Sequence, residues 1–259
     1  NNGKIYSQNY SKGKVKSKIK IEKCSKKLKG TEISFIPDKD IFEIISFNPG
    51  RLYQFIKMKA VLVKSTSVIF NIDKELIKDS TPSKEIFFYK KGIEEFIEDK
   101  SKNKVKLINK YFSIKYKINQ NEFFETVITF NNNEKSFFRS YCNTIETPDG
   151  GSHENGIKNG IVKAIKLYGR KNQFGKISNI NINDVIDYSD ILVSIFINEP
   201  SFEGQTKKRV VMPKLQKLLE EIIENEFLKW LNSNKKIANK LMETLIERSL
   251  LRTDLHKIK

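Results

Sequence analysis

The segment between residues 191 and 213 constrains the fold of this chain more than any other. An apolar run at 191–197 predicts a strand, and a helix is predicted to begin near Pro213. The loop between them reads PSFEGQTK over residues 200–207. Gly204 would let the backbone approach a ligand closely, Gln205 can donate an amide N–H, and Lys207 supplies a point charge. This composition is compatible with a phosphate-binding loop, but from the residues alone the basic run 207–209 fits a solvated surface better.

The overall charge of the chain points to a polyanionic partner. The 259 residues carry a formal net charge of +17, which indicates nucleic acid first and an anionic membrane surface second. An apolar content of 38% is enough for one large or two modest domains. No apolar run reaches the roughly 18 residues that a spanning helix needs, and no signal peptide is evident, so we expect no membrane partner.

The cysteines and the first residues indicate a cellular context. Cys24 and Cys142 lie far apart without metal-ligand spacing. A reducing cytoplasm is therefore the simplest interpretation, and no metal site is predicted within the chain. The chain begins with Asn1 rather than methionine, and we expect an internal cut point there.

Positive charge is concentrated near the N-terminus. Residues 1–30 hold ten lysines and one glutamate, which gives this segment a net +9 of the total +17. Five lysines occupy alternate positions, with apolar residues among them: Lys12, Lys14, Lys16, Lys18 and Lys20. In a strand this spacing places lysines on one face and apolar groups on the other. That face would be either an ordinary solvated sheet surface or a DNA-facing surface.

Hydrophobic periodicity predicts a mixture of strands and helices. Strands are predicted at 5–10, 14–22, 31–36, 67–72, 85–89, 123–130, 136–143 and 191–197. Helices are predicted from 48 to about 62, from Gly92, from Ser152 to Gly169, at 183–188, from Pro213 to about 231 and at 235–252. The first of these helices is expected to bury a stripe that includes Phe55. Because strands and helices do not alternate strictly, the predicted class is α+β.

Three local features complete this interpretation. The lysine-rich stretch 100–110 is predicted to be a linker, and residues 131–134 are predicted to close a hairpin between the strands 123–130 and 136–143. Ser152 is the candidate N-cap of the helix that follows.

Four segments resemble one known family in order and spacing. Residues 143–153, NTIETPDGGSH, are similar to the pattern N-x-I-x-T-x-x-G-G-T-H, with Ser152 in place of threonine. Residues 29–35 resemble a G-T-x-V-x-F strand, residues 57–62 a K-A-V-L helix end, and residues 204–207 a Q-T-K loop. Together they resemble the B subunits of type IIA DNA topoisomerases, which are the ATPase subunits of gyrase and topoisomerase IV. The resemblance covers nearly the whole chain, and residues 57–62 favour topoisomerase IV.

The resemblance implies a domain organisation. Residues 1–91 would be the C-terminal half of a GHKL ATPase domain and the end of its sheet. Residues 92–259 would be a transducer domain, with a left-handed β-α-β crossover and long C-terminal helices.

The resemblance also implies the site residues and the cofactors. Lys207 would contact the γ-phosphate of ATP as the catalytic residue, with Gln205 holding the phosphate or the loop, and Thr31 would lie near the adenine. The Mg²⁺ ligands and the general base would lie outside this chain. We therefore expect the full subunit to be an ATP-hydrolysing topoisomerase and this piece alone to be inactive.

The implied partners are double-stranded DNA, a topoisomerase A subunit and a second copy of the B subunit, in the cytoplasm at the nucleoid. Arg139 and Lys135 are candidates for a basic DNA-guiding surface. His153 is interpreted as a structural hydrogen-bonding residue because no nucleophile and carboxylate accompany it in a triad. Three alternatives stay open: gyrase, a chaperone or mismatch-repair GHKL relative, and a plain nucleic-acid-binding module.

Overall fold

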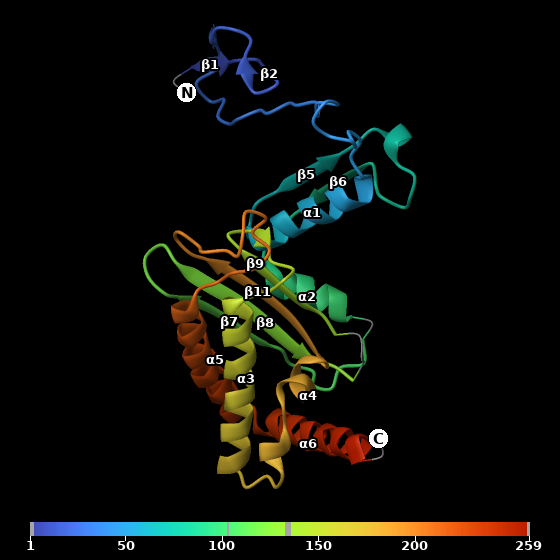
Figure 1. The fold of residues 1–259 in the computed structure, drawn as a ribbon, viewed down its shortest axis with the longest axis vertical. Coiled ribbons are helices and arrows are strands. Elements are labelled where there is room, and N and C mark those ends of the chain that lie inside the picture. Colours follow the sequence, from blue (N-terminus) through green and yellow to red (C-terminus); the bar gives the residue numbers. More distant parts are fainter. Residues whose placement is uncertain (1–2, 103, 133–135, 258–259) are drawn as a thin grey trace. The chain divides into compact units, whose positions relative to one another are not determined.

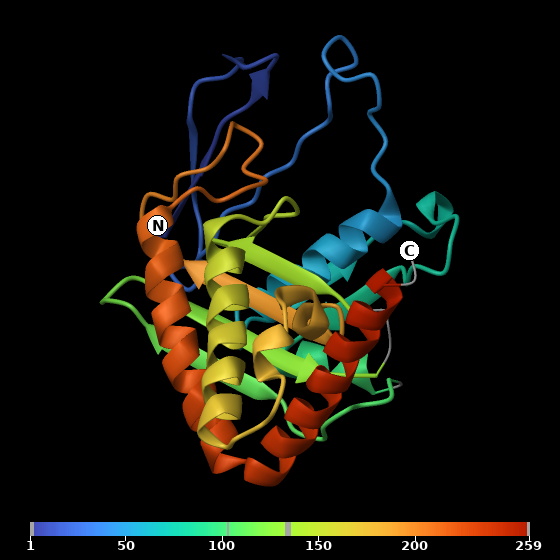
Figure 2. The same ribbon diagram turned by 60° about the horizontal axis from the view of Figure 1, so that its bottom comes forward.

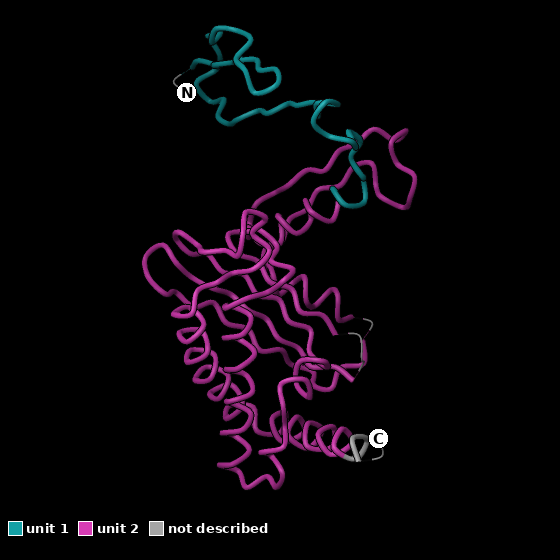
Figure 3. The backbone as a smooth tube through the Cα atoms, in the orientation of Figure 1, with its two compact units in different colours: residues 1–52 teal, residues 53–259 magenta. Residues whose placement is uncertain are grey.

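The computed structural model describes residues 3–102, 104–132 and 136–257, with side chains as far as Thr253. The chain divides into two compact units, Asn1–Leu52 and Tyr53–Lys259, shown in separate colours in Figure 3. Among the described residues, no helix is both long enough and apolar enough to cross a membrane.

The described part of the first unit contains short strand pairs and, at its end, the start of a helix. Strand β1 (Lys4–Ser7) pairs with β4 (Lys20–Lys23), and β2 (Tyr10–Ser11) pairs with β3 (Lys14–Val15), both antiparallel. The prediction of one continuous strand over 14–22 is therefore wrong, because residues 16–19 are not in a strand. No described residue of this unit is buried, so its lysines and its apolar groups alike face solvent.

The strand predicted at 31–36 does not form either. The backbone there has no strand assignment, and the side chains of Ile33 and Ile36 are 81% and 90% exposed. A strand persists only where a neighbour satisfies its backbone hydrogen bonds and covers one face. No described segment of this unit supplies that neighbour.

A helix that begins at the end of the first unit leads into the second unit and is followed by a hairpin. Helix α1 (Pro49–Leu62) is followed by β5 (Val68–Asn71), a short 3-10 helix η1 (Lys74–Leu76) and β6 (Lys84–Phe87), which pairs with β5. The ring of Tyr53 makes edge-on contacts with Phe70 and Phe87, at 5.4 and 5.1 Å between centroids. The predicted helix and both strands are confirmed. The expected burial of Phe55 is wrong, since this side chain is 59% exposed.

A five-stranded sheet forms the centre of the second unit (Figure 1). Its strands are β7 (Phe112–Lys117), β8 (Phe123–Phe130), β9 (Phe138–Cys142), β10 (Ile145–Glu146) and β11 (Ser189–Phe196). They lie in the order β10-β9-β11-β8-β7, with β11 parallel to β9 and antiparallel to β8. The α+β class is confirmed. The predicted hairpin between 123–130 and 136–143 is wrong, because β11 lies between these strands; residues 133–135 of its turn lie outside the described part.

Helices pack on this sheet and on one another. They are α2 (Ile93–Ser101), α3 (Ser152–Lys171), the 3-10 helix η2 (Ile177–Asn179), α4 (Ile182–Ile186), α5 (Pro213–Ser233) and α6 (Lys235–Lys257). Helices α3 and α5 lie side by side over one face of the sheet in Figures 1 and 2. A Cβ atom on Gly156 or Gly160 would lie 2.6 or 2.7 Å from a backbone oxygen of α5. These glycines therefore allow the two helices to approach closely.

Both faces of the two central strands are buried. Ile128 of β8 and Ile191 and Val193 of β11 belong to the main core beneath α3 and α5. Val127 and Leu192 are neighbours of these residues along the strands, so their side chains point to the opposite face of the sheet. Both are buried there, on the side on which α2 packs. This two-sided burial explains why the run 191–197 is apolar without alternation.

The predicted linker at 100–110 is wrong where it is described. Leu107 and Ile108 are each 3% exposed and belong to the main core. Lys104 donates hydrogen bonds of 2.6 and 2.7 Å to both carboxylate oxygens of the fully buried Asp190. Two apolar anchors and a buried ion pair hold this lysine-rich stretch to the sheet.

Replacing Asp190 should cost far more stability than replacing an exposed carboxylate. Asp190→Asn leaves the ammonium of Lys104 facing a buried neutral group, and we expect a loss on the order of 3 kcal/mol in urea denaturation. Asp99 pairs with Lys102 at 2.6 Å on the surface, so Asp99→Asn should cost less than about 1 kcal/mol. Equal losses in the two variants would contradict this assignment.

Candidate functional site

The loop that follows strand β11, residues 198–212, has a regular base. Val211 N donates to Ser201 O at 2.9 Å, and Glu203 N donates to Arg209 O at 2.9 Å. At the tip, Lys207 N donates to Gly204 O at 3.3 Å and closes a turn. The loop is therefore a small antiparallel projection with residues 204–207 at its end.

The structure brings Gln205 and Lys207 together at this tip, and both are exposed. Lys207 has a left-handed backbone with φ of 56°, and its ammonium lies 6.0 Å from the ring centroid of Phe202. No acidic group in the described part of the chain forms a salt bridge with Lys207. The ammonium of Lys207 is therefore exposed, and its role in binding phosphate stays a prediction.

The base of the loop is hydrogen-bonded to the glycine-rich segment 147–152. Val210 N donates to Gly150 O at 3.1 Å, and Val210 O accepts from Ser152 N at 2.9 Å. Gly151 has a φ of 125°, and a Cβ there would lie 2.1 Å from Val210 O. Two segments that are distant in the sequence therefore meet through backbone contacts that only glycine permits.

Ser152 has a different role from the one predicted. The N-cap of α3 is Gly151, and the Oγ of Ser152 accepts a 2.8 Å hydrogen bond from Met212 N. The serine therefore fixes the end of the loop at Met212, directly before helix α5 begins. Sequence reasoning missed this because a serine before a helix is usually its cap.

A buried polar network supports the same segment. His153 is fully buried, and its Nε2 lies 3.0 Å from Thr147 Oγ1, which lies 2.6 Å from Ser140 Oγ. Ser140 Oγ in turn donates to Glu154 Oε1 at 2.7 Å. Burial, and to a lesser extent the positive charge of Lys158, lowers the pKa of His153 to about 4. A neutral, hydrogen-bonded histidine confirms the structural interpretation.

A second anchor lies at the root of the loop. Asn143 donates from Nδ2 to Ile197 O at 2.9 Å and accepts at Oδ1 from Ile197 N at 3.0 Å. The side chain therefore satisfies both backbone groups of the residue that precedes the loop. Sequence reasoning included Asn143 in a motif but did not predict this role. The available signal was an asparagine within a two-residue connection between strands.

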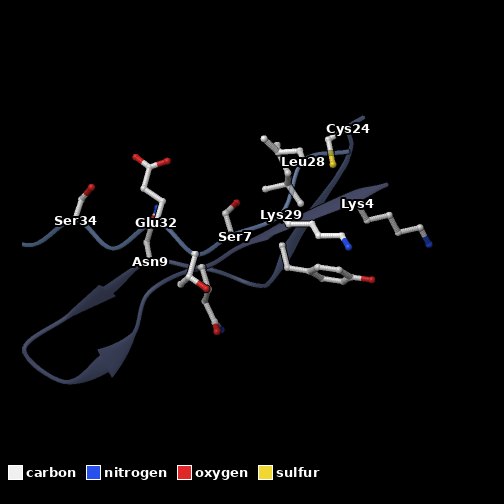
Figure 4. Close-up of a pocket in the computed structure, with 13 residues that line it drawn as sticks. Lys4, Ser7, Asn9, Cys24, Leu28, Lys29, Glu32 and Ser34 are labelled. Atoms are coloured by element: carbon white, nitrogen blue, oxygen red, sulfur yellow. The ribbon is translucent and has the colours of Figure 1, made fainter. Parts of the chain in front are cut away.

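The remaining predicted residues lie elsewhere. Thr31 is an exposed residue of the first compact unit, where it lines a hollow with residues 4–9, Cys24, residues 28–32 and Ser34 (Figure 4). Arg139 is exposed on β9, and Lys135 lies outside the described residues. The described residues contain no group of three or more His, Cys, Asp or Glu side chains that could hold a metal ion.

Comparison with known proteins identifies the family. The DNA gyrase B family matches this chain over residues 92–259. The chain belongs to the DNA gyrase B family. Two relatives are the DNA topoisomerase 4 B subunit of Rickettsia felis, 37% identical over 247 residues, and the DNA gyrase B subunit of Helicobacter pylori, 30% identical over 247 residues. These matches cover 94% and 93% of this chain but only 37% and 31% of the relatives.

Solved structures of the family share the fold. The topoisomerase IV ATP-binding domain of Francisella tularensis, solved with a small-molecule inhibitor, is 27% identical with a TM-score of 0.80. It matches 97% of this chain and 67% of its own length. The 43K ATPase domain of Thermus thermophilus gyrase B, solved with an aminocoumarin, has a TM-score of 0.71 at 21% identity, over 99% of this chain and 68% of its own. The resemblance to type IIA topoisomerase B subunits is confirmed.

A side chain at position 151 should disrupt the hydrogen bonds between the base of the 198–212 loop and the segment 147–152. Gly151→Ala would force its Cβ against Val210 O, so we expect a loss of about 3 kcal/mol in urea denaturation. A Cβ on Gly175 would have nothing within 4 Å, and Gly175 has no left-handed φ, so Gly175→Ala should change stability by less than about 0.5 kcal/mol. If both variants unfold at the same urea concentration, the close approach does not constrain the loop.

The buried histidine should make stability depend on pH. Its pKa is lowered from 6.5 to about 4 in the folded chain, so the unfolded state binds more protons within that window. Stability should therefore fall on the order of 3 kcal/mol as the pH drops from 6.5 towards 4. His153→Gln should flatten the profile by this amount in urea denaturation at each pH. Parallel profiles for the two proteins would exclude His153 as the titrating group.

Proposed function

We propose that this chain is the transducer region, residues 92–259, with part of the ATPase domain, residues 1–91, of the B subunit of a type II DNA topoisomerase. The observation that carries the proposal is the exposed Gln205–Lys207 tip on a loop whose base is hydrogen-bonded to the glycine-rich segment 147–152. Family membership supports it. The 37% identity with a topoisomerase 4 relative, against 30% with a gyrase relative, favours topoisomerase IV.

The proposed role of the loop is to sense the terminal phosphate of ATP. ATP with Mg²⁺ would be held mainly by residues outside this chain. The charge of its terminal phosphate would be present in the site only until the phosphate is hydrolysed and released. Lys207 would neutralise that charge, Gln205 would donate an amide N–H, and Thr31 would contact the adenine region. Two features support this role. The ammonium of Lys207 has no salt bridge among the described residues. A Cβ built on Gly204 would have no atom within 4 Å, so there is space for a phosphate.

The loop is connected to the helices that would carry the signal. Its base is bonded to the N-terminus of α3 through Ser152 and continues directly into α5. A displacement of Lys207 would therefore act on the two helices that pack together through Gly156 and Gly160. The signal would pass from phosphate charge to loop position and from there to helix position.

The proposed complex includes further partners. The full-length protein would dimerise, join a topoisomerase A subunit, and pass one DNA duplex through another in the cytoplasm at the nucleoid. The exposed Arg139 would contribute to a basic surface that guides the DNA by salt-sensitive phosphate contacts. The chain by itself would not hydrolyse ATP, because the residues that activate water and hold Mg²⁺ would belong to other parts of the full-length protein.

The test compares neighbouring cations in the full-length protein with its A subunit. Lys207→Ala should lower ATP-dependent decatenation by about 100-fold or more, the usual effect of removing one group that stabilises transition-state charge. Lys208→Ala, which removes an exposed cation one residue away, should leave the rate near wild type. Unchanged decatenation in Lys207→Ala, with tight DNA binding by the chain itself, would instead favour a plain nucleic-acid-binding module.

A further inference from the structure

A lysine of helix α1 holds the turn that roots the 198–212 loop. Lys59 Nζ donates to Thr144 O at 2.6 Å and to Thr144 Oγ1 at 3.0 Å. The same ammonium lies 4.9 Å from the ring centroid of Phe55. Lys59 is half-buried, and burial lowers its pKa. The end of α1 and the turn between β9 and β10 lie beside each other in Figure 1, within the second compact unit.

The turn that Lys59 holds has an unfavourable backbone. Asn143 and Thr144 connect β9 to β10 with φ values of 49° and 66°. Two-residue turns of this kind favour glycine at the second position, and a β-branched residue rarely adopts a left-handed conformation. Such a conformation persists where surrounding contacts hold it. Lys59 supplies these contacts, because it bonds both the carbonyl and the hydroxyl of Thr144.

The turn is connected directly to the loop. Asn143 bonds both backbone groups of Ile197 through its side chain, and its own N–H donates to Ile195 O at 2.8 Å. Residue 198, the first of the loop, follows immediately. A continuous series of contacts therefore runs from Lys59 through Thr144, Asn143 and Ile197 to the loop that carries Lys207.

We propose that Lys59 is a positioning residue for Lys207. By holding the strained turn, Lys59 would fix the root of the loop and transmit movements of α1 to the loop tip. The inference rests on the proposed function of Lys207. Its physical basis is that a left-handed turn is costly by itself, and that the hydrogen bonds from Lys59 stabilise the conformation in which Asn143 reaches Ile197.

The first test measures catalysis in the full-length protein with its A subunit. Lys59→Met keeps the aliphatic stem but removes the donors, and should lower ATP-dependent decatenation by about 10-fold to 100-fold, as small misplacements of a catalytic group do. Lys59→Arg should restore most of the rate. Lys57, on the same helix, forms no hydrogen bond or salt bridge among the described residues, so Lys57→Met should behave as wild type.

A double variant separates positioning from general support of the fold. If Lys59 acts through Lys207, Lys59→Met should cause no further loss in a Lys207→Ala background. Additive losses would overturn the inference while leaving the role of Lys207 intact. A full rate in Lys59→Met would do the same. An unchanged rate in Lys207→Ala alone would remove the proposed function and this inference together.

Hydrogen exchange in the full-length protein tests the same coupling without catalysis. Lys59→Met should raise exchange of the Ile197 amide by about tenfold, since one charge-assisted contact that holds the turn is lost. Core amides of β8 should keep their protection. If Lys59→Met also raises exchange of the core amides, the milder variant Thr144→Val is measured in its place, because it removes only the Oγ1 acceptor. Unchanged exchange at Ile197 in a folded variant would overturn the inference.

Discussion

The position of strand β11 determines the rest of the second unit. It lies between β9 and β8 and runs parallel to β9. Because the carboxyl ends of parallel neighbours emerge at the same edge of a sheet, the segment after β9 and the loop after β11 meet there. The parallel pairing also requires a crossover, which α3 supplies. The contacts of Asn143, directly after β9, with Ile197, directly after β11, follow from this arrangement.

The loop combines a fixed base with an exposed tip. Backbone hydrogen bonds, the side chain of Asn143 and the hydroxyl of Ser152 hold the base at three points. The tip keeps the ammonium of Lys207 in solvent without a salt bridge among the described residues. The proposed detection of phosphate charge would need both properties: a cation accessible to the ligand, and a frame that converts its displacement into movement elsewhere. The neutral state of His153 contributes to this frame, because burial disfavours a charged imidazole there.

The first unit shows how far local pattern depends on tertiary context. Residues 31–36 have the alternation of a strand, yet Ile33 and Ile36 are almost fully exposed and no strand forms. The reverse holds at 100–110, where a composition typical of linkers contains Leu107, Ile108 and the partner of a buried aspartate. In both places the decisive quantity is whether another segment covers the residues. Composition alone does not contain that information.

The sequence by itself determined the α+β class, most helix positions, the strand at 191–197 and the family, because periodicity and short motifs depend on residues close in the chain. The assignment of Gln205 and Lys207 to phosphate binding also came from the sequence and stays a prediction. Only the tertiary structure decided that β11 separates β8 from β9, that Ser152 binds the loop rather than capping α3, and that Asn143 holds Ile197. Each of these is a contact between segments more than 40 residues apart, and its geometry depends on how the sheet is ordered.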